Sequence, residues 1–423
     1  MTQTASVPGP VAAQVRMPLW RPWLAFLFGF FLQFNILIGG GEGDAVIGGY
    51  GFRALDFLSV LAVALLLIHA VLPRRVLALA VFTAIIGAMS LLRIQDPTFW
   101  SDSRTVTLAL HYLAYSFSGL YLATICSDDF VVMRFCWGLI VGLLATVPIF
   151  VLQDLGYSSS LVELGLVPGW HDMVDLGSGD IARYSGLWGH PNQAGHIAAL
   201  AGAAGAYFVF HRRWIPAVLV ATALVTVFYY TESRGGLIAG GSVLALSLLF
   251  ERKHKLDFFR IAIVAIAVII VIALLLQIDF IAYRFEADPT AASNFSERLA
   301  STWAGIEVAL ANPLGLNLDV YNSEMFSASG VGTPHNGFIS AAIILGMVPF
   351  LLLIASFLAN CRVRDEADQF FLFLTVQVSV SFMFEQVPAD YDYAFIICLL
   401  FGRAFLRTHI GQELRANGGT QKM

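Results

Sequence analysis

The feature that most limits the possible folds is a series of apolar runs near bilayer length, which recurs along the whole chain. A transmembrane helix needs about 20 mainly apolar residues, because in lipid every backbone N–H and C=O must be paired within the helix. Hydrophobic residues make up 58% of the chain and charged residues only 13%, whereas soluble domains carry roughly 25% charged residues. We therefore expect an all-α polytopic membrane protein in which residues 1–423 form a single transmembrane domain.

Twelve of these runs are expected to cross the membrane, and the eighth and eleventh are short. Their ends are uncertain by about 2–4 residues when they are assigned from sequence. The runs cover residues 22–38, 55–72, 76–92, 105–125, 130–152, 190–210, 214–230, 235–250, 258–278, 337–358, 370–384 and 391–406.

The distribution of basic residues predicts the orientation of the spans. Cytoplasmic loops carry an excess of Lys and Arg, and basic residues recur in alternate loops on the same side as both termini, at 74–75, 212–213, 252–255, 362–364 and 403–407. Of the 24 Lys and Arg residues, 17 then lie on the cytoplasmic side. The other seven are all Arg and lie on the external side: Arg53, Arg93, Arg104, Arg183, Arg234, Arg284 and Arg298. Because Arg binds phosphate through two parallel hydrogen bonds, these residues indicate an anionic substrate on the external face.

Two predicted external loops are long, at residues 153–189 and 279–336. Long loops in compact proteins are usually functional or disordered, and the apolar segments within these two favour a functional role. The second loop is expected to hold an amphipathic helix on the external membrane surface, with Ser296 as its N-cap and Asn312-Pro313 at its end. Its apolar residues at helical spacing are Leu299, Trp303, Ile306 and Leu310. Both loops are acidic, which fits either a carbohydrate-facing surface or a solvated cap.

Arg183 precedes a predicted helix start at His190-Pro191-Asn192. Helix N-termini present unpaired N–H groups to anions, so Arg183 and this helix start together predict a diphosphate site supported by His190 and Asn192. The alternative is a helix cap with an interfacial anchor. His190 and His196 are a second alternative as metal ligands, but their spacing and the lack of a third ligand nearby argue against a metal.

Arg234 lies in the short external turn at residues 231–236, beside Gly235 and Gly236. The glycines would let a substrate approach the backbone closely, which favours a second phosphate-binding Arg at this position. The alternative is a surface ion pair between Glu232 and Arg234, which is usually worth only about 0–1 kcal/mol.

His335 and Asn336 lie where the longest external loop re-enters the membrane. A partly desolvated His gains or loses a proton near neutral pH, as a general base must, and Asn336 is placed to fix its tautomer or bind a hydroxyl. The alternative is a structural His, in which case Glu297 or Glu324 would be the base. Arg298, at the head of the predicted amphipathic helix, is either a third anion-binding Arg or a capping charge.

These motifs together resemble the O-antigen ligase and O-antigen polymerase superfamily of bacterial lipid-linked glycan transferases. The resemblance is clearest over residues 183–350. It rests on Arg183-x-x-Gly186, His190-Pro191-Asn192, Ser233-Arg234-Gly235-Gly236, Arg298-x-x-x-x-Trp303, Asn312-Pro313-x-Gly315 and His335-Asn336, which occur in this order. The family's common Asn-Pro-Asn form reads His190-Pro191-Asn192 here, so a role for its first Asn does not carry over.

The resemblance implies a GT-C-like fold in the bacterial inner membrane, with the active site facing the periplasm. It implies transfer of a glycan from undecaprenyl diphosphate to an acceptor sugar hydroxyl in lipopolysaccharide biosynthesis, with no cofactor and no metal. Arg183, Arg234 and, less directly, Arg298 would bind the diphosphate, and His335 would be the catalytic base. The expected partners are the lipid-linked donor, a lipid A core or other glycan acceptor, and membrane lipids, with no nucleic acid.

Two other functions stay open on the sequence. A polymerase would use the same donor with a second lipid-linked repeat as acceptor. Certain polymerases carry Gly sixteen residues after a periplasmic Arg, but here the corresponding positions are Ala199 after Arg183 and Leu314 after Arg298, which favours a ligase weakly. A transporter or flippase of lipid-linked glycans is less expected, because the polar motifs gather at one membrane face and no half-to-half repeat is visible.

Overall fold

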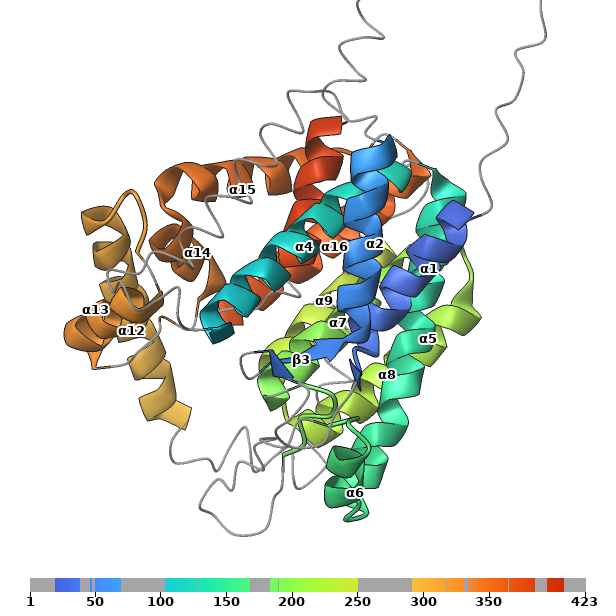
Figure 1. Ribbon diagram of the computed structural model, residues 1–423, viewed down its shortest axis with the longest axis horizontal. Coiled ribbons are helices and arrows are strands. Elements are labelled where there is room, and N and C mark those ends of the chain that lie inside the picture. The colour runs from blue at the N-terminus through green and yellow to red at the C-terminus, as the bar shows by residue number, and fades with distance from the viewer. Residues whose placement is uncertain are drawn as a thin grey trace, which may run out of the picture.

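The protein is described from a computed structural model, which forms a helical bundle flanked by shorter helices (Figure 1). The described residues are 20–38, 46–47, 50–69, 103–126, 128–167, 183–188, 190–249, 291–316, 318–330, 334, 336–363, 365–384 and 394–406. The long helices are α1 (Trp20–Gln33), α2 (Ala54–His69), α4 (Ser103–Ile125), α5 (Asp129–Asp154), α7 (Pro191–Phe210), α8 (Trp214–Thr231), α9 (Arg234–Leu249), α12 (Ala291–Ala311), α15 (Met347–Asn360) and α16 (Glu366–Phe384). The shorter helices are α6 (Ser158–Glu163), α13 (Leu318–Ser329) and α14 (Gly337–Leu345), and a last apolar helix covers Ala394–Leu406.

The helical class predicted from the apolar runs is confirmed, and most helices that correspond to a predicted run begin and end within a few residues of it. Within the described residues, α5, α8 and α16 are long and apolar enough to cross a membrane, and five shorter apolar helices accompany them. The count of twelve spans stays a prediction, as does the GT-C-like arrangement. The runs at 76–92 and 258–278 lie outside the described residues.

The tenth predicted span, residues 337–358, is wrong as a continuous helix. It is divided into α14 and α15 at Gly346, which adopts a positive φ of 86°. The turn at Asn312-Pro313-Leu314-Gly315 packs against this break: the N–H of Met347 donates to the Pro313 carbonyl at 2.9 Å, and the N–H of Leu316 donates to the Ile343 carbonyl at 2.7 Å. The Asn-Pro-x-Gly motif therefore supplies backbone partners to a broken helix.

A small antiparallel sheet, which the sequence did not predict, follows α1. Its strands β1 (Leu37–Ile38), β2 (Val46–Ile47) and β3 (Tyr50–Arg53) lie in the order β1-β3-β2, with Leu37 opposite Arg53 and Ile47 opposite Tyr50. The sheet leads directly into α2, where the Asp56 carboxylate accepts a hydrogen bond from the Arg53 N–H at 2.6 Å. The strands are too short to give an alternating pattern that can be read from sequence.

Helices α1 and α5 lie side by side through glycine contacts. A Cβ at Gly29 would lie 2.3 Å from the Phe135 carbonyl oxygen, and Cβ atoms at Gly138 and Gly142 would lie 2.1 and 2.4 Å from carbonyl oxygens of α1. Gly138 and Gly142 are four residues apart and so share one helix face, as in membrane helices that pack through small residues. The close approach of the two backbones depends on these glycines.

Glycine contacts also bring α7 and α9 together. A Cβ at Gly236 would lie 2.6 Å from the Gly195 carbonyl carbon, and a Cβ at Gly202 would lie 3.1 Å from the Gly240 Cα. Both helices therefore run in the same direction with their N-termini adjacent. Helix α8 runs in the opposite direction, because it connects the end of α7 to the start of α9.

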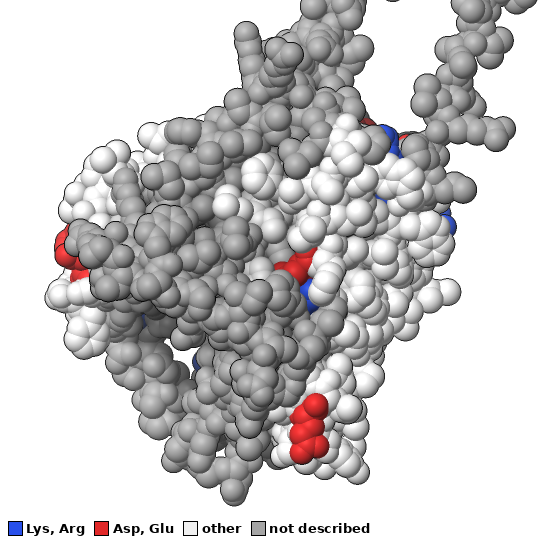
Figure 2. Space-filling view, in the orientation of Figure 1, with Lys and Arg blue, Asp and Glu red and all other residues white. Residues whose placement is uncertain are grey.

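Basic side chains gather at one end of the bundle. Arg134, near the start of α5, lies over the Trp23 ring of α1 at 5.6 Å, and Arg403 donates to Asp368 near the start of α16 at 3.0 Å. The starts of α5 and α16 also meet the end of α7. Figure 2 shows basic side chains where α1 and α5 begin, on a face that is otherwise largely uncharged in its described part. These are the helix ends predicted to be cytoplasmic.

Three described helices lie within the long predicted loops: α6 in the first, and α12 and α13 in the second. The amphipathic helix expected in the second loop is present and ends at Ala311, just before Asn312-Pro313. Ser296 is not its N-cap, since α12 already begins at Ala291. Leu299, Trp303 and Leu310 are exposed on α12, as a helix lying against lipid requires.

Candidate functional site

Arg183 is fixed by three residues from two separate parts of the chain. Its Nε donates to the Thr231 carbonyl oxygen at 3.0 Å and its Nη2 donates to the Asn192 Oδ1 at 2.7 Å. The Nε also lies 3.9 Å from the Glu232 Oε2, and both side chains are largely buried, at 11% and 3% exposure. Arg183 therefore ties the start of α7 to the end of α8, and the guanidinium direction is set by the fold.

The turn at residues 231–236 is ordered by local hydrogen bonds. Glu232 ends α8 in the left-handed conformation, with φ at 52°. The N–H of Ser233 donates to the Thr231 Oγ1 at 3.3 Å, and the Ser233 Oγ accepts from the Gly236 N–H at 3.2 Å. Arg234 follows in this turn as the first residue of α9. It is therefore close in sequence to Thr231, whose carbonyl oxygen accepts the hydrogen bond from Arg183.

The glycines after Arg234 allow neighbouring helices to pack closely, whereas the sequence predicted that they would let a substrate approach the backbone. A Cβ at Gly235 would lie 2.8 Å from both the His196 Nε2 and the Phe384 Cβ, and Gly236 contacts the backbone of Gly195. Both therefore admit neighbouring helices rather than a substrate. Close packing of α7 and α9 holds Arg234 next to the start of α7.

His190 and Asn192 form the start of α7. His190 is the N-cap, and its Nδ1 accepts from the Asn192 N–H at 3.1 Å, with Pro191 at the first helical position. The Asn192 side chain meanwhile accepts from Arg183. The predicted pairing of Arg183 with a helix N-terminus is thus present, with Asn192 as the direct contact and the His190 ring as an exposed cap.

His190 and His196 are not held together as a ligand pair. The His196 ring is buried in α7, and its Nδ1 lies 3.0 Å from the Ser381 Oγ of α16, whereas His190 is exposed. The metal-capable cluster found among the described residues consists of Asp129, His211 and Glu366, none of which the sequence reading had singled out.

Arg298 lies on the exposed face of α12. Its charge interacts electrostatically with His196 in the first half of α7. Its carbonyl oxygen accepts from the hydroxyls of Ser301 and Thr302, so the backbone here is also tied within its own helix. Arg183 thus contacts the start of α7 directly through Asn192, Arg234 begins a helix whose Gly235 and Gly236 pack against the first half of α7, and Arg298 interacts electrostatically with His196.

Asn336 is the N-cap of α14, and its Oδ1 accepts from the N–H groups of Phe338 and Ile339 at 3.1 and 3.2 Å. The capping role accounts for an Asn at this position without any contact to a substrate. The side-chain amide nitrogen takes no part in the cap and is able to donate to another group. His335, the predicted base, lies outside the described residues. Its neighbour Pro334 packs against Gly305 of α12, the helix that carries Arg298.

Several polar residues near Arg183 were not identified from sequence. Tyr184 donates to Asp154 at 3.1 Å, and Gln153 accepts from the Gly186 N–H at 3.0 Å, so the end of α5 supports the Arg183 segment. Burial raises the pKa of Tyr184 and the hydrogen bond with Asp154 raises it further, so this phenol stays protonated as a donor. The only sequence signal is that these residues lie at the two ends of the long loop at residues 153–189.

Tyr321 and Ser340 form a second buried polar contact, between α13 and α14, with the two hydroxyl oxygens 3.2 Å apart. Burial raises the pKa of Tyr321 to about 12, so it is neutral at physiological pH. The contact fixes α13 against the helix that Asn336 caps. It was not expected from the sequence.

Comparison with known protein families gives one match, to the family model described as O-antigen ligase, over residues 218–354. A comparison with curated proteins found no match. The matched region contains Arg234, Arg298, His335 and Asn336, whereas Arg183, His190 and Asn192 precede it. The matched region is similar to that family, and the match agrees with the superfamily indicated by the motifs.

Proposed function

We propose that the protein is an inverting glycosyltransferase of the O-antigen ligase type. It transfers a glycan from undecaprenyl diphosphate to an acceptor sugar hydroxyl on the periplasmic face of the inner membrane, in lipopolysaccharide biosynthesis. The observation that carries this proposal is the fixed position of Arg183 between Thr231 and Asn192, beside the turn that begins with Thr231 and ends in Arg234. Two arginines beside a helix N-terminus suit a diphosphate group.

The arginines act on the leaving group. As the bond between the anomeric carbon and the diphosphate oxygen breaks, negative charge grows on that oxygen. Arg183 and Arg234 would stabilise this charge, with Arg298 adding to the local positive potential. Arg183 is already oriented by Asn192 and Thr231, so little reorganisation accompanies the reaction. This role needs no metal.

The base acts on the acceptor. His335 would accept the proton of the acceptor hydroxyl as its oxygen forms the new bond to the anomeric carbon. Undecaprenyl diphosphate leaves from the opposite face, and the anomeric configuration is inverted. The proton passes to His335 and then to solvent, and so the reaction needs no other reactant.

A polymerase is the second candidate, since the matched family supports glycan processing of either ligase or polymerase type. The two differ only in acceptor: a lipid A core sugar for the ligase, and a second lipid-linked repeat for the polymerase. Purified enzyme supplied with donor and each acceptor in turn distinguishes them. Transport of lipid-linked glycans is less favoured, because it uses no base and no diphosphate leaving group.

The test of the mechanism is transfer by purified protein carrying His335→Ala. We expect the rate to fall by roughly 10²–10⁴-fold, the usual share of general-base catalysis, while donor binding persists because the arginines remain. The wild-type rate should rise with pH through a single ionisation near the ordinary His value of about 6.5, since only the neutral imidazole accepts a proton.

His254→Ala is the control, because residues 252–255 belong to a predicted cytoplasmic loop and should not affect transfer. Near-normal turnover in a folded His335→Ala protein would assign the base to another residue, such as Glu297 or Glu324. Loss of transfer on addition of a chelator to wild-type protein that stays folded would refute metal-independent catalysis.

A further inference from the structure

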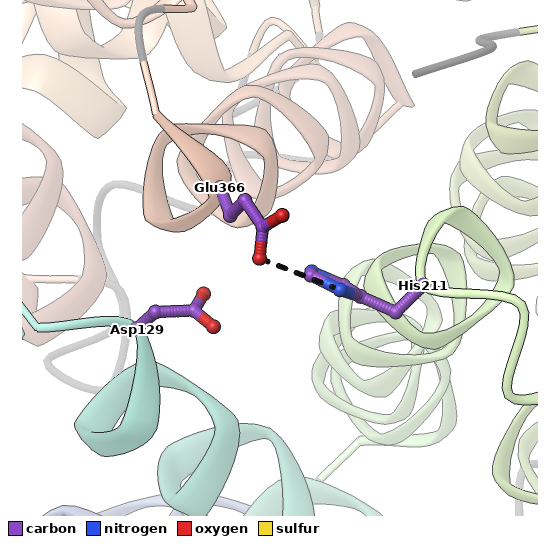
Figure 3. Close-up of side chains that lie close together, drawn as sticks. All are labelled: Asp129, His211 and Glu366. Carbon is purple, nitrogen blue, oxygen red and sulfur yellow. Dashed lines mark ion pairs between the residues drawn. The ribbon is translucent and has the colours of Figure 1, made fainter.

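Asp129, His211 and Glu366 converge at the end of the bundle away from Arg183, and each comes from a different helix end (Figure 3). Asp129 is the first residue of α5, His211 follows α7, and Glu366 is the first residue of α16. Their ligand atoms all lie within 4.8 Å of one another, and the His211 Nδ1 is 3.8 Å from the Glu366 Oε2.

From this convergence we infer that the three residues form a binding site for a divalent cation of the zinc type. An imidazole nitrogen with two carboxylate oxygens is a ligand set that Zn²⁺ accepts, with water completing the coordination. Zn²⁺ binds such ligands at about 2.0–2.2 Å, which places neighbouring ligand atoms roughly 3.4 Å apart in a tetrahedron. The present spacing is slightly wider, and the Glu366 side chain, at 53% exposure, has room to move inward.

Charge favours a cation at this point. Two carboxylates whose oxygens lie within 4.8 Å repel each other, and a divalent ion would neutralise both. Helix dipoles explain an acid at the start of α5 and another at the start of α16, and they explain a histidine at the end of α7. They do not explain why all three side chains turn toward one point.

Tyr207 supports two of the ligands. Its hydroxyl donates to the Asp129 Oδ1 in a short hydrogen bond, and its ring lies against the His211 ring with centroids 4.4 Å apart. Groups that orient metal ligands in this way usually alter affinity by about 10–100-fold when removed. Tyr207 is therefore the positioning residue of the proposed site.

The site is separate from the diphosphate site. Asn192 and His211 mark opposite ends of α7, whose 20 residues span about 30 Å. An ion here would join α5, α7 and α16 at the end where the basic residues gather, and so would stabilise the bundle rather than take part in transfer. The proposal does not depend on the transferase activity.

The experiment is calorimetric titration of untagged, chelator-treated, full-length protein with Zn²⁺, and with Mg²⁺ for comparison. Wild type should bind one equivalent of Zn²⁺ and bind Mg²⁺ much more weakly, because Mg²⁺ prefers oxygen ligands. Glu366→Gln and His211→Gln should each weaken Zn²⁺ binding by more than about 100-fold, and Tyr207→Phe by about 10–100-fold. Co²⁺ in place of Zn²⁺ should give visible absorption bands in wild type that His211→Gln lacks.

Asp365→Asn is the matched control. Asp365 precedes Glu366, is similarly exposed, and pairs with Arg403 at 3.5 Å, so it loses the same charge without losing a ligand. Its Zn²⁺ affinity should match wild type. Glu366 is half exposed, so Glu366→Gln tests the site even if His211→Gln does not fold. Absence of Zn²⁺ binding in wild type, or wild-type affinity in Glu366→Gln, would overturn the proposal and leave the cluster as three helix-end charges.

Discussion

At the residue scale, Arg183 shows how a largely buried charged side chain is held at one end of the helical bundle. It contacts a carbonyl at the end of α8, an amide at the start of α7 and a buried carboxylate, Glu232. The Nε makes the contacts with Thr231 and Glu232 and the Nη2 makes the contact with Asn192, so the arrangement uses two donors of the guanidinium fork, which Lys does not possess. The buried Glu232 carboxylate also depends on this cation, because a buried charge left without a partner is costly.

We therefore predict that Arg183→Lys loses most transfer activity although it keeps the charge. The loss should appear mainly as weaker donor binding, because the fork that positions the diphosphate contact is gone. Arg234→Lys should behave in the same way. Donor binding to purified protein measures both variants.

Arg213→Lys is the control for these variants. Arg213 is exposed in the turn at the other end of α7, where its guanidinium contacts the Met133 sulfur at 3.1 Å. Its donor affinity should equal that of wild type. Unchanged donor binding in both Arg183→Lys and Arg234→Lys would leave these arginines with a structural role only.

At the element scale, the relative position of α7 and α9 depends on backbone contact at Gly195 and Gly236. Because a Cβ at Gly236 would meet the Gly195 carbonyl carbon at 2.6 Å, even Ala must push the helices apart. The N-terminal residue of α9 is Arg234, so any separation also moves a predicted phosphate ligand.

We expect Gly236→Ala to destabilise the protein by about 1–3 kcal/mol, the usual cost of overpacking, and to lower transfer. Gly241→Ala, five residues later in α9, is the matched control because a Cβ there meets nothing within 4 Å. In that position Ala should be neutral or stabilising by roughly 0.5–1 kcal/mol, since Gly weakens helix interiors. Thermal unfolding in detergent compares the two, and equal stabilities would show that the α7–α9 contact tolerates extra atoms.

At the scale of the whole molecule, charge is sorted between the two ends of the bundle. Arg134 and Arg403 lie at the end where α5 and α16 begin, while Arg183 and Arg234 lie at the opposite end. Arg212 and Arg213, between α7 and α8, add to the basic residues at the Arg134 end, so the positive-inside rule predicts that the Arg183 end is external. The proposed reaction requires this orientation, because the lipid-linked donor is used in the periplasm.

We predict that reporter fusions at Val174 and Ser329 report a periplasmic location, and that a fusion at Arg213 reports a cytoplasmic one. Val174 and Ser329 belong to the two long loops predicted to be external, and Arg213 to the turn between α7 and α8. An enzyme reporter active only in the cytoplasm measures all three. Cytoplasmic activity at Val174 or Ser329 would refute the proposed reaction, since the donor glycan would be on the wrong side.

The sequence by itself determined the helical membrane class, the ends of most helices and the motifs of the matched family. These features follow from local properties. The length of an apolar run, a helix cap and the basic residues of a loop can each be recognised from a short stretch of consecutive residues. Helices α5, α7, α8 and α9 begin and end within two residues of the predicted runs for this reason. The pairing of Arg183 with the start of α7 also followed from local order along the chain.

Only the tertiary structure decided which side chains meet across distant segments. The contact of Gly236 with Gly195, the support of Gly186 by Gln153 and the convergence of Asp129, His211 and Glu366 join residues far apart in sequence. The break at Gly346 likewise depends on the Asn312–Gly315 turn, because this segment supplies hydrogen-bond partners to the backbone groups that the broken helix leaves unpaired. Such contacts depend on how the helices pack. A single sequence shows the apolar periodicity of each helix, but it does not show which face of one helix packs against which other helix.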